Sequence, residues 1–184
     1  MNKFKIIALL MLTISTLTYG QAPNNMIDTT TIAPKWGNLA GQGFTIQYPT
    51  DWDIDISRAM NTNFILFSPI DSPQDPFREN VNLIIQDLSD YDFTLEQYAV
   101  LSTEQIKTMI TDGKIIVNEQ KGVGEKAYQK VIYSGKQGMF DLQFEQYYWV
   151  INKKAYVLTL TCTIDQFDNY QEIGEAIMDS FEIK

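Results

Sequence analysis

The stretch FDLQFEQYYWVINKKAYVLTLTC, residues 140–162, determines the fold that we predict for this chain. Large or apolar side chains recur at every second residue up to Val150, and again from Tyr156 to Cys162. This period of two is typical of β-strands, because successive side chains of a strand point to opposite faces. The polar residues 152–154 lie between the two runs and suit a hairpin turn. We therefore predict two long antiparallel strands.

The rest of the chain predicts more strands and two helices. Two segments have apolar residues at helical spacing: 94–113, which Thr94 and Gln97 open as a capping box, and 167–180. The order of strands, helix, meander, helix and a short extended tail predicts an α+β fold, with helices against the faces of an antiparallel β-sheet. The other expected strands are 44–48, 63–68, 81–86, 114–120, 126–133 and the tail 181–183.

The first 20 residues predict a cleavable signal peptide. Lys3 and Lys5 precede a mostly apolar core at 6–17, and small residues precede Gln21. An uncleaved anchor is the alternative, but Thr and Ser interrupt an apolar run that is short for a membrane span. Because Cys162 is the only cysteine, a lipid-modified N-terminal cysteine is not expected either. We expect a periplasmic or secreted protein without membrane insertion after cleavage; the sequence does not distinguish these two locations.

The remaining chain divides into two parts. Residues 21–42 are rich in Thr, Asn, Pro and Gly and predict a flexible polar linker. Trp36 is the exception, and we expect it to pack against the domain edge. Residues 43–184 predict a single domain, since a chain of this length suffices for one hydrophobic core.

Composition excludes several classes of function. The chain has 23 acidic and 14 basic residues, a formal net charge of −9, which disfavours binding to nucleic acid because phosphate backbones are also negative. It has no histidine, which excludes Ser-His-Asp and Cys-His catalysis and histidine-ligated zinc. One cysteine cannot form an internal disulfide.

Three aspartates at alternate positions, Asp51, Asp53 and Asp55, are a candidate Ca²⁺ site, because their carboxylates would point the same way on a strand. An EF-hand loop starting at Asp51 would need Gly and Glu where Ile56 and Thr62 stand. We therefore interpret the three as solvated acids and assign no metal ligand.

Two further motifs fail their structural tests. Asp90 and Asp92 lack the EF-hand glycine and glutamate as well. Gly122, Gly124 and Ala127 match the loose dinucleotide pattern G-x-G-x-x-A, which requires a following helix to receive the pyrophosphate. Because the residues that follow alternate like a strand, we predict a hairpin turn there and no cofactor.

Two other features have alternative explanations. Cys162 shares strand parity with core leucines, which predicts a buried small hydrophobe rather than a reactive thiol. Tyr147, Tyr148 and Trp149 place aromatic rings on both faces of one strand. One face is expected to be core, and the other is either an exposed patch for a ligand or partner or lies under a helix; we favour packing. Pairs of carboxylates could serve a hydrolase, but nothing distinguishes one pair, so no catalytic residue is assigned.

Three segments together resemble the PsbP-like family: GFTIQYPTDWDI at 43–54, GEKAYQKVIYSG at 124–135 and KKAYVLTLTCTIDQFDNYQEIGEAIMDSFEI at 153–183. The resemblance implies an α/β/α sandwich around an antiparallel sheet. It implies no activity, since members of the wider superfamily include photosystem subunits, a Ran-binding nuclear import factor and bacterial exported proteins. The matched positions are interpreted as structural, with Trp52 covering the sheet edge: Phe44, Tyr48, Pro49, Trp52, Tyr156, Phe181 and Ile183.

The predicted function is therefore an exported non-enzymatic binding or accessory module that acts through protein–protein contacts in the cell envelope. Its expected partner is another envelope or secreted protein. A small-ligand or Ca²⁺ carrier is the first alternative, which the acidic clusters and the aromatic-rich sheet motivate. A carboxylate-dependent hydrolase is the second, and a deep cleft holding two carboxylates with raised pKa values would favour it.

Overall fold

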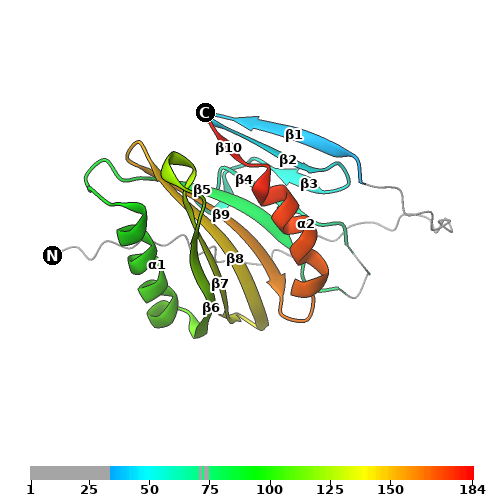
Figure 1. Ribbon diagram of the computed structural model, residues 1–184. Coiled ribbons are helices and arrows are strands. Elements are labelled where there is room, and N and C mark those ends of the chain that lie inside the picture. The colour runs from blue at the N-terminus through cyan, green and yellow to red at the C-terminus, as the bar shows by residue number, and fades with distance from the viewer. Residues whose placement is uncertain (1–33, 71, 73–74) are drawn as a thin grey trace.

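The computed structural model describes residues 34–70, 72 and 75–184. The predicted signal peptide and the first part of the predicted linker lie outside the described residues. The described chain consists of antiparallel sheets and two α-helices, which confirms the α+β class (Figure 1). No helix in this part of the chain has both the length and the apolar character that crossing a membrane requires.

The larger sheet has seven strands in the order β3-β4-β5-β9-β8-β7-β6, and all of its pairings are antiparallel. Its second half is the predicted meander. Asn152 and Lys153 both have left-handed φ angles, 50° and 59°, as the tight hairpin between β8 and β9 requires. The strands are β3 (Asp53–Asp55), β4 (Phe64–Phe67), β5 (Asn80–Asp87), β6 (Thr111–Lys121), β7 (Tyr128–Gln137), β8 (Phe140–Ile151) and β9 (Lys154–Thr163).

A second sheet contains three strands, β1 (Trp36–Gly41), β2 (Phe44–Pro49) and β10 (Glu182–Ile183), in the order β1-β2-β10. The sequence predicts a single sheet, and the structure divides the strands into two. The division falls after Pro49, where the Trp52 N–H donates to the Pro49 carbonyl at 3.0 Å and turns the chain into the larger sheet.

The predicted linker at 21–42 is wrong for Trp36–Gly41, which pairs along its whole length with β2. The glycines that gave this segment its linker-like composition are required by packing. A Cβ atom on Gly37 would lie 2.8 Å from the ring of Tyr48, and one on Gly41 would lie 2.2 Å from the ring of Phe44. The aromatic rings of β2 therefore pack over glycine backbone in β1.

Both predicted helices are present. Helix α1 (Leu95–Met109) begins with the predicted capping box: the Thr94 hydroxyl accepts the Gln97 N–H and the Gln97 side chain accepts the Thr94 N–H. It ends at Met109 rather than near Gly113, because strand β6 already begins at Thr111. Helix α2 (Phe167–Asp179) matches the prediction closely.

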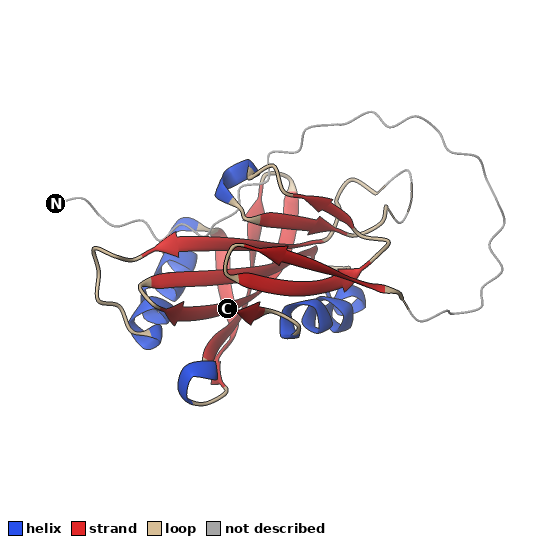
Figure 2. Cartoon of the chain, turned by 90° about the horizontal axis from the view of Figure 1, so that it is seen from above, coloured by secondary structure: helices blue, strands red, loops and turns tan. Residues whose placement is uncertain are grey.

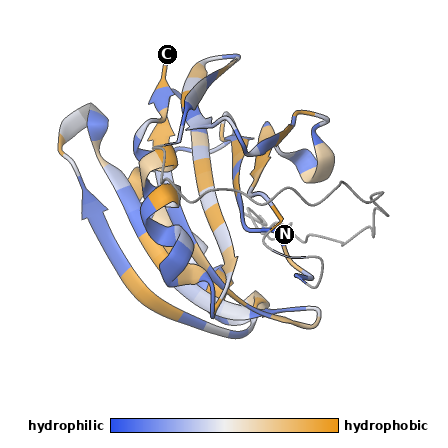
Figure 3. Ribbon diagram, turned by 90° about the vertical axis from the view of Figure 1, so that its right-hand side faces the viewer, coloured by the Kyte–Doolittle hydropathy of each residue, from blue (hydrophilic) through white to orange (hydrophobic). Residues whose placement is uncertain are grey.

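The two helices contact different faces of the larger sheet. Val157 of β9 packs in a cluster with Tyr98 and Ile106 of α1, whereas the next residue, Leu158, packs in a cluster with Ile177 of α2. We call the cluster that contains Leu158 and Ile177 the α2 cluster. The three-stranded sheet also contributes apolar side chains to it. Figure 2 shows the helices toward opposite ends of the stacked strands, and in Figure 3 orange and blue alternate along the strands and around α2.

Trp52 is a core residue. Its side chain is only 6% exposed, and its ring makes an edge contact with Tyr170 of α2 at a centroid distance of 6.3 Å. The neighbouring Asp51 and Asp53 are exposed, so the Trp52 ring alone of these three enters the core.

We predict that Trp52→Ala lowers the free energy of unfolding by about 3–5 kcal/mol, because truncating a buried aromatic ring leaves a cavity. Chemical denaturation measures the loss. The matched control is Trp36→Ala, whose side chain is 40% exposed, and there we expect a change of about 1 kcal/mol or less. Equal effects at both positions would contradict the assignment of Trp52 to the core.

Candidate functional site

Three of the five aspartates at the candidate metal positions have other partners. Asp53 forms an ion pair with Arg78 at 2.8 Å, the Asp55 carboxylate accepts the Ser57 N–H at 2.7 Å, and Asp92 pairs with Lys153. Within the described residues, no three Asp, Glu, Cys or His side chains are placed to hold one metal ion.

The glycine motif forms a hairpin turn, as predicted. After β6, the chain makes one short 3-10 helix, η2 (Gly124–Lys126), and then enters β7. Gly122 and Gly124 have φ angles of 70° and 60°, the left-handed region that glycine tolerates best. The α-helix that a dinucleotide site needs is replaced by a strand.

Cys162 and the aromatic run are buried. Cys162 lies in the α2 cluster, and burial raises the pKa of its thiol, which agrees with the predicted structural role. Tyr148 lies under α1, where its ring makes an edge contact with Tyr98 at 5.6 Å. Tyr147 and Trp149 face the other way, toward α2. Packing is thus confirmed for both faces, and the second face also borders a groove.

This groove lies between the start of β7, the end of β8 and the C-terminal end of α2 with β10, and its volume is about 500 Å³. We name it the aromatic groove. Its wall is formed by four aromatic rings, from β7, from β8 and from the segment between α2 and β10. The groove is lined by Lys126, Tyr128, Tyr147, Trp149, Ile151, Met178, Asp179, Phe181, Glu182 and Ile183.

The four rings contact each other in a continuous series. Tyr128 lies 4.6 Å from Tyr147 and 5.3 Å from Trp149, and Trp149 lies 5.2 Å from Phe181, measured between ring centroids. Tyr147, Trp149 and Phe181 are at least nine-tenths buried, whereas Tyr128 is half-buried. Three of the four rings are therefore part of the core, and Tyr128 has the most accessible ring of the wall.

The acidic side of the groove comes from Asp179 and Glu182, both exposed. Partial burial and the neighbouring Glu175 carboxylate raise the pKa of Asp179. A hydrogen bond with Tyr147 lowers it, but by less, so the net pKa is raised. The groove thus joins aromatic faces to carboxylates, and the only lysine that lines it among the described residues is Lys126.

A buried charge cluster supports this wall from behind. The Lys130 ammonium lies 2.7 Å from a Glu145 oxygen and 2.8 Å from a Glu175 oxygen, and it also lies 5.7 Å from the centroid of the Tyr147 ring. Glu145 is fully buried, and its second oxygen accepts a hydrogen bond from Gln171 of α2 at 3.4 Å. The cluster therefore fixes α2 against β7 and β8.

The pKa directions in the cluster follow from burial and pairing. Burial raises the pKa of Glu145, and Lys130 offsets only part of that effect. For Lys130, burial alone would lower the pKa, but Glu145 and Glu175 outweigh it and the pKa is raised. For Glu175, burial alone would raise the pKa, but the interactions with Lys130 outweigh it and the pKa is lowered.

One carboxylate with a raised pKa, Asp179, lines the groove. Two carboxylates with raised pKa values in one cleft would favour a hydrolase. Glu145 and Asp179 both have a raised pKa, but only Asp179 lines the groove. Glu145 is fully buried and paired with Lys130. Aromatic rings beside carboxylates offer apolar contact and cation–π attraction to a positively charged group.

The sequence patterns did not indicate Lys130, Glu145, Glu175 or Tyr128. Lys130 and Glu145 alternate with core residues on predicted strands, which is the ordinary pattern of a solvated face, so no local signal marked their burial. Glu175 gives no signal either, because its side of α2 also carries other polar residues.

We predict that Lys130→Met lowers the free energy of unfolding by about 3–5 kcal/mol near neutral pH, because it leaves Glu145 buried without a counter-ion. Without Lys130, the pKa of Glu145 in the folded state rises further above that of the unfolded chain. The folded state then takes up a proton first, so stability is partly recovered as the pH falls from about 7 toward about 5. Denaturant unfolding at several pH values measures both effects.

Two controls accompany this variant. Lys107→Met removes an exposed ion pair with Glu104 and should cost about 1 kcal/mol or less. Adding Glu145→Leu to Lys130→Met should recover most of the loss, because it removes the uncompensated charge. If Lys130→Met cost no more than Lys107→Met, the cluster would not be a buried one.

Comparison with known proteins identifies the fold. No protein-family model matches the chain, and no curated protein matches it by sequence. The solution structure of the cyanobacterial PsbP protein (CyanoP) from Synechocystis superposes with a TM-score of 0.61 at 16% identity, over 89% of this chain and 100% of that one.

Two further solved structures are similar. PA94 of Pseudomonas aeruginosa, described as a protein of unknown function and putative regulator, gives a TM-score of 0.59 at 14% identity, over 81% of this chain and 97% of its own. LpqN of Mycobacterium tuberculosis, described as involved in cell envelope biogenesis, gives a TM-score of 0.55 at 12% identity, over 83% of this chain and 92% of its own. The chain has a PsbP-like fold, as its three sequence motifs predicted.

Proposed function

We propose that this protein is an exported, non-enzymatic accessory module of the cell envelope that binds another envelope or secreted protein through the aromatic groove. The observation that carries the proposal is the groove itself. It is about 500 Å³ in volume, its wall is built from four contacting rings, and Asp179 and Glu182 lie on its acidic side. Tyrosine and tryptophan are the residues that contribute most often to binding energy at protein interfaces.

The chemistry of the groove selects its partner. We expect a segment with a lysine or arginine beside an apolar side chain. The cation would lie between Asp179, Glu182 and the Tyr128 ring, and the apolar side chain would contact Trp149 and Phe181. Because three of the four rings are already packed in the core, few side chains would lose freedom when the partner docks, which favours such binding.

Three further considerations support the proposal. The predicted signal peptide directs the chain out of the cytoplasm, to the periplasm or the medium. One structural neighbour, LpqN, is described as involved in cell envelope biogenesis. A helix against each face of the larger sheet is consistent with the α/β/α sandwich that the family resemblance implies. We therefore propose an accessory rather than a catalytic role within this fold.

The test is a comparison of charge-reversal variants. We predict that Glu182→Lys abolishes capture of the partner from an envelope extract at physiological salt. Glu182 is exposed and its side chain makes no ion pair with another described residue, so folding should be retained. Affinity capture followed by mass spectrometry identifies proteins that the wild-type chain retains and the variant loses.

The matched control is Glu172→Lys, on the exposed side of α2 and outside the groove. It makes the same change in net charge, so it should retain the partner. If no protein is captured above background, or if both variants lose the same proteins equally, the groove is not the binding surface and the proposal fails.

A further inference from the structure

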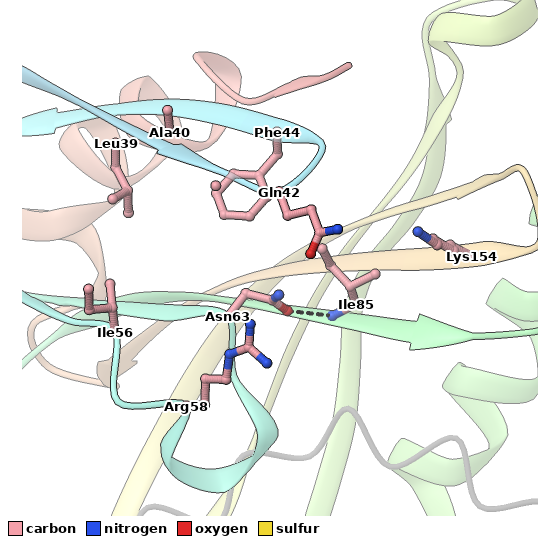
Figure 4. Close-up of a pocket in the computed structure, with 10 residues that line it drawn as sticks. Leu39, Ala40, Gln42, Phe44, Ile56, Arg58, Asn63, Ile85 and Lys154 are labelled. Carbon is pink, nitrogen blue, oxygen red and sulfur yellow. Dashed lines mark hydrogen bonds between the residues drawn. The ribbon is translucent and has the colours of Figure 1, made fainter.

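A second pocket lies between the two sheets and has the opposite electrostatic character. We name it the inter-sheet pocket. Its volume is about 480 Å³, and it is bounded by the turn between β1 and β2, the loop around η1 (Ala59–Asn61), β5 and the start of β9 (Figure 4). It shares no lining residue with the aromatic groove, so it is a separate site.

Two cationic side chains line this pocket, Arg58 and Lys154, and no described carboxylate does. In a chain with 23 acidic and 14 basic residues, this local excess of positive charge runs against the composition. Neither cation makes an ion pair with another described residue. Asp87 interacts electrostatically with Lys154, but this is the smallest cause of its lowered pKa, which Ser89 mainly sets.

Polar donors accompany the cations. Asn63 is oriented by its own oxygen, which accepts the Ile85 N–H at 3.1 Å, so its side-chain NH₂ group remains to donate. Figure 4 shows Arg58 reaching from its loop toward Asn63, and Lys154 extending toward Gln42 and Ile85. A guanidinium, an ammonium and an amide donor therefore line the same pocket.

The backbone that presents Arg58 is strained. Arg58, Met60 and Asn61 have φ angles of 62°, 54° and 64°, the left-handed region that non-glycine residues rarely adopt. Such conformations concentrate where a ligand site needs a side chain in a particular place. Here the strained loop places a guanidinium in the lining of the pocket.

Apolar side chains complete the lining. They are Leu39, Phe44, Ile56 and Ile85, which come from both sheets and from the loop before η1. Ile85 is partly buried, whereas Ile56 is 66% exposed. The pocket therefore combines two cationic groups with apolar surface.

We infer that the inter-sheet pocket binds a small amphiphilic anion, a carboxylate or phosphate group carried on an apolar chain. Arg58 can hold such a head group through two parallel N–H···O bonds, with Lys154 as a second charge and Asn63 as a neutral donor. The apolar chain would lie against Phe44 and Ile85, where it displaces water from aliphatic surface.

The inference is tested by titration with defined probes below their micellar concentrations: octanoate, octyl phosphate, inorganic phosphate and octyltrimethylammonium. The two anionic amphiphiles should bind saturably and shift the amide resonances of Asn63, Ile85 and Lys154 in ¹H–¹⁵N spectra. Inorganic phosphate should bind at least about tenfold more weakly, because it lacks the chain. Saturable binding of the cationic amphiphile at the same resonances would overturn the inference.

Charge-removal variants assign the binding to named groups. Arg58→Gln and Lys154→Gln should each weaken octyl phosphate about tenfold or more, since each removes a charge-assisted interaction. Lys114→Gln, an exposed lysine on β6 outside the pocket, removes the same charge and should leave affinity unchanged. Melting temperatures show whether all three variants fold. If they fold and all three bind octyl phosphate equally more weakly, the attraction is a general electrostatic one and the assignment of the site is wrong.

One further arm distinguishes the source of the head group. Sedimentation with phosphatidylglycerol vesicles that is lost in Arg58→Gln and kept in Lys114→Gln would identify a membrane lipid as the source. Binding of free octanoate or octyl phosphate without vesicle binding would identify a soluble amphiphile. The absence of saturable binding by either route would overturn the inference.

Discussion

The structure depends on one constraint: its central strands are buried on both faces. In β9 the eight residues 155–162 are all buried, although a strand in an antiparallel sheet commonly faces water on one side. Each face therefore needs a cover. Helix α1 supplies one, and α2 together with the three-stranded sheet supplies the other. Gly174 allows α2 to approach closely, because a Cβ atom there would lie 2.6 Å from the Leu160 side chain.

The buried interior also contains polar groups, and among them the charged cluster around Lys130 links the core to the aromatic groove. Lys130 and Glu145 lie on adjacent strands at diagonal positions of the same face, so they meet once the register of β7 and β8 is set. Glu175 then reaches Lys130 from α2. A misplaced α2 would leave the charge of Glu145 incompletely compensated. The cluster therefore favours one position of α2 on the sheet, which hydrophobic packing alone would specify less precisely.

Sequence periodicity predicted most of this fold because β8, β9 and α2 combine strong patterns with good turn and cap residues. It failed at β1, where Gly37 and Gly41 look like linker residues and are strand residues under the rings of β2. Neither pocket could be predicted, because each joins segments distant along the chain. The left-handed conformation of Arg58 has no sequence signature, since arginine does not favour it.

The two pockets show the limits of an argument from net charge. A charge of −9 is a sound reason against binding a long polyanion, which would meet the acidic surface along its whole length. A small ligand, or a short segment of a protein partner, is different, because at physiological ionic strength screening reduces the influence of charges beyond about 8 Å. Its affinity depends on the groups that line its own pocket: Asp179 and Glu182 in the aromatic groove, Arg58 and Lys154 in the inter-sheet pocket. One acidic protein can therefore present a site for a cation and a site for an anion.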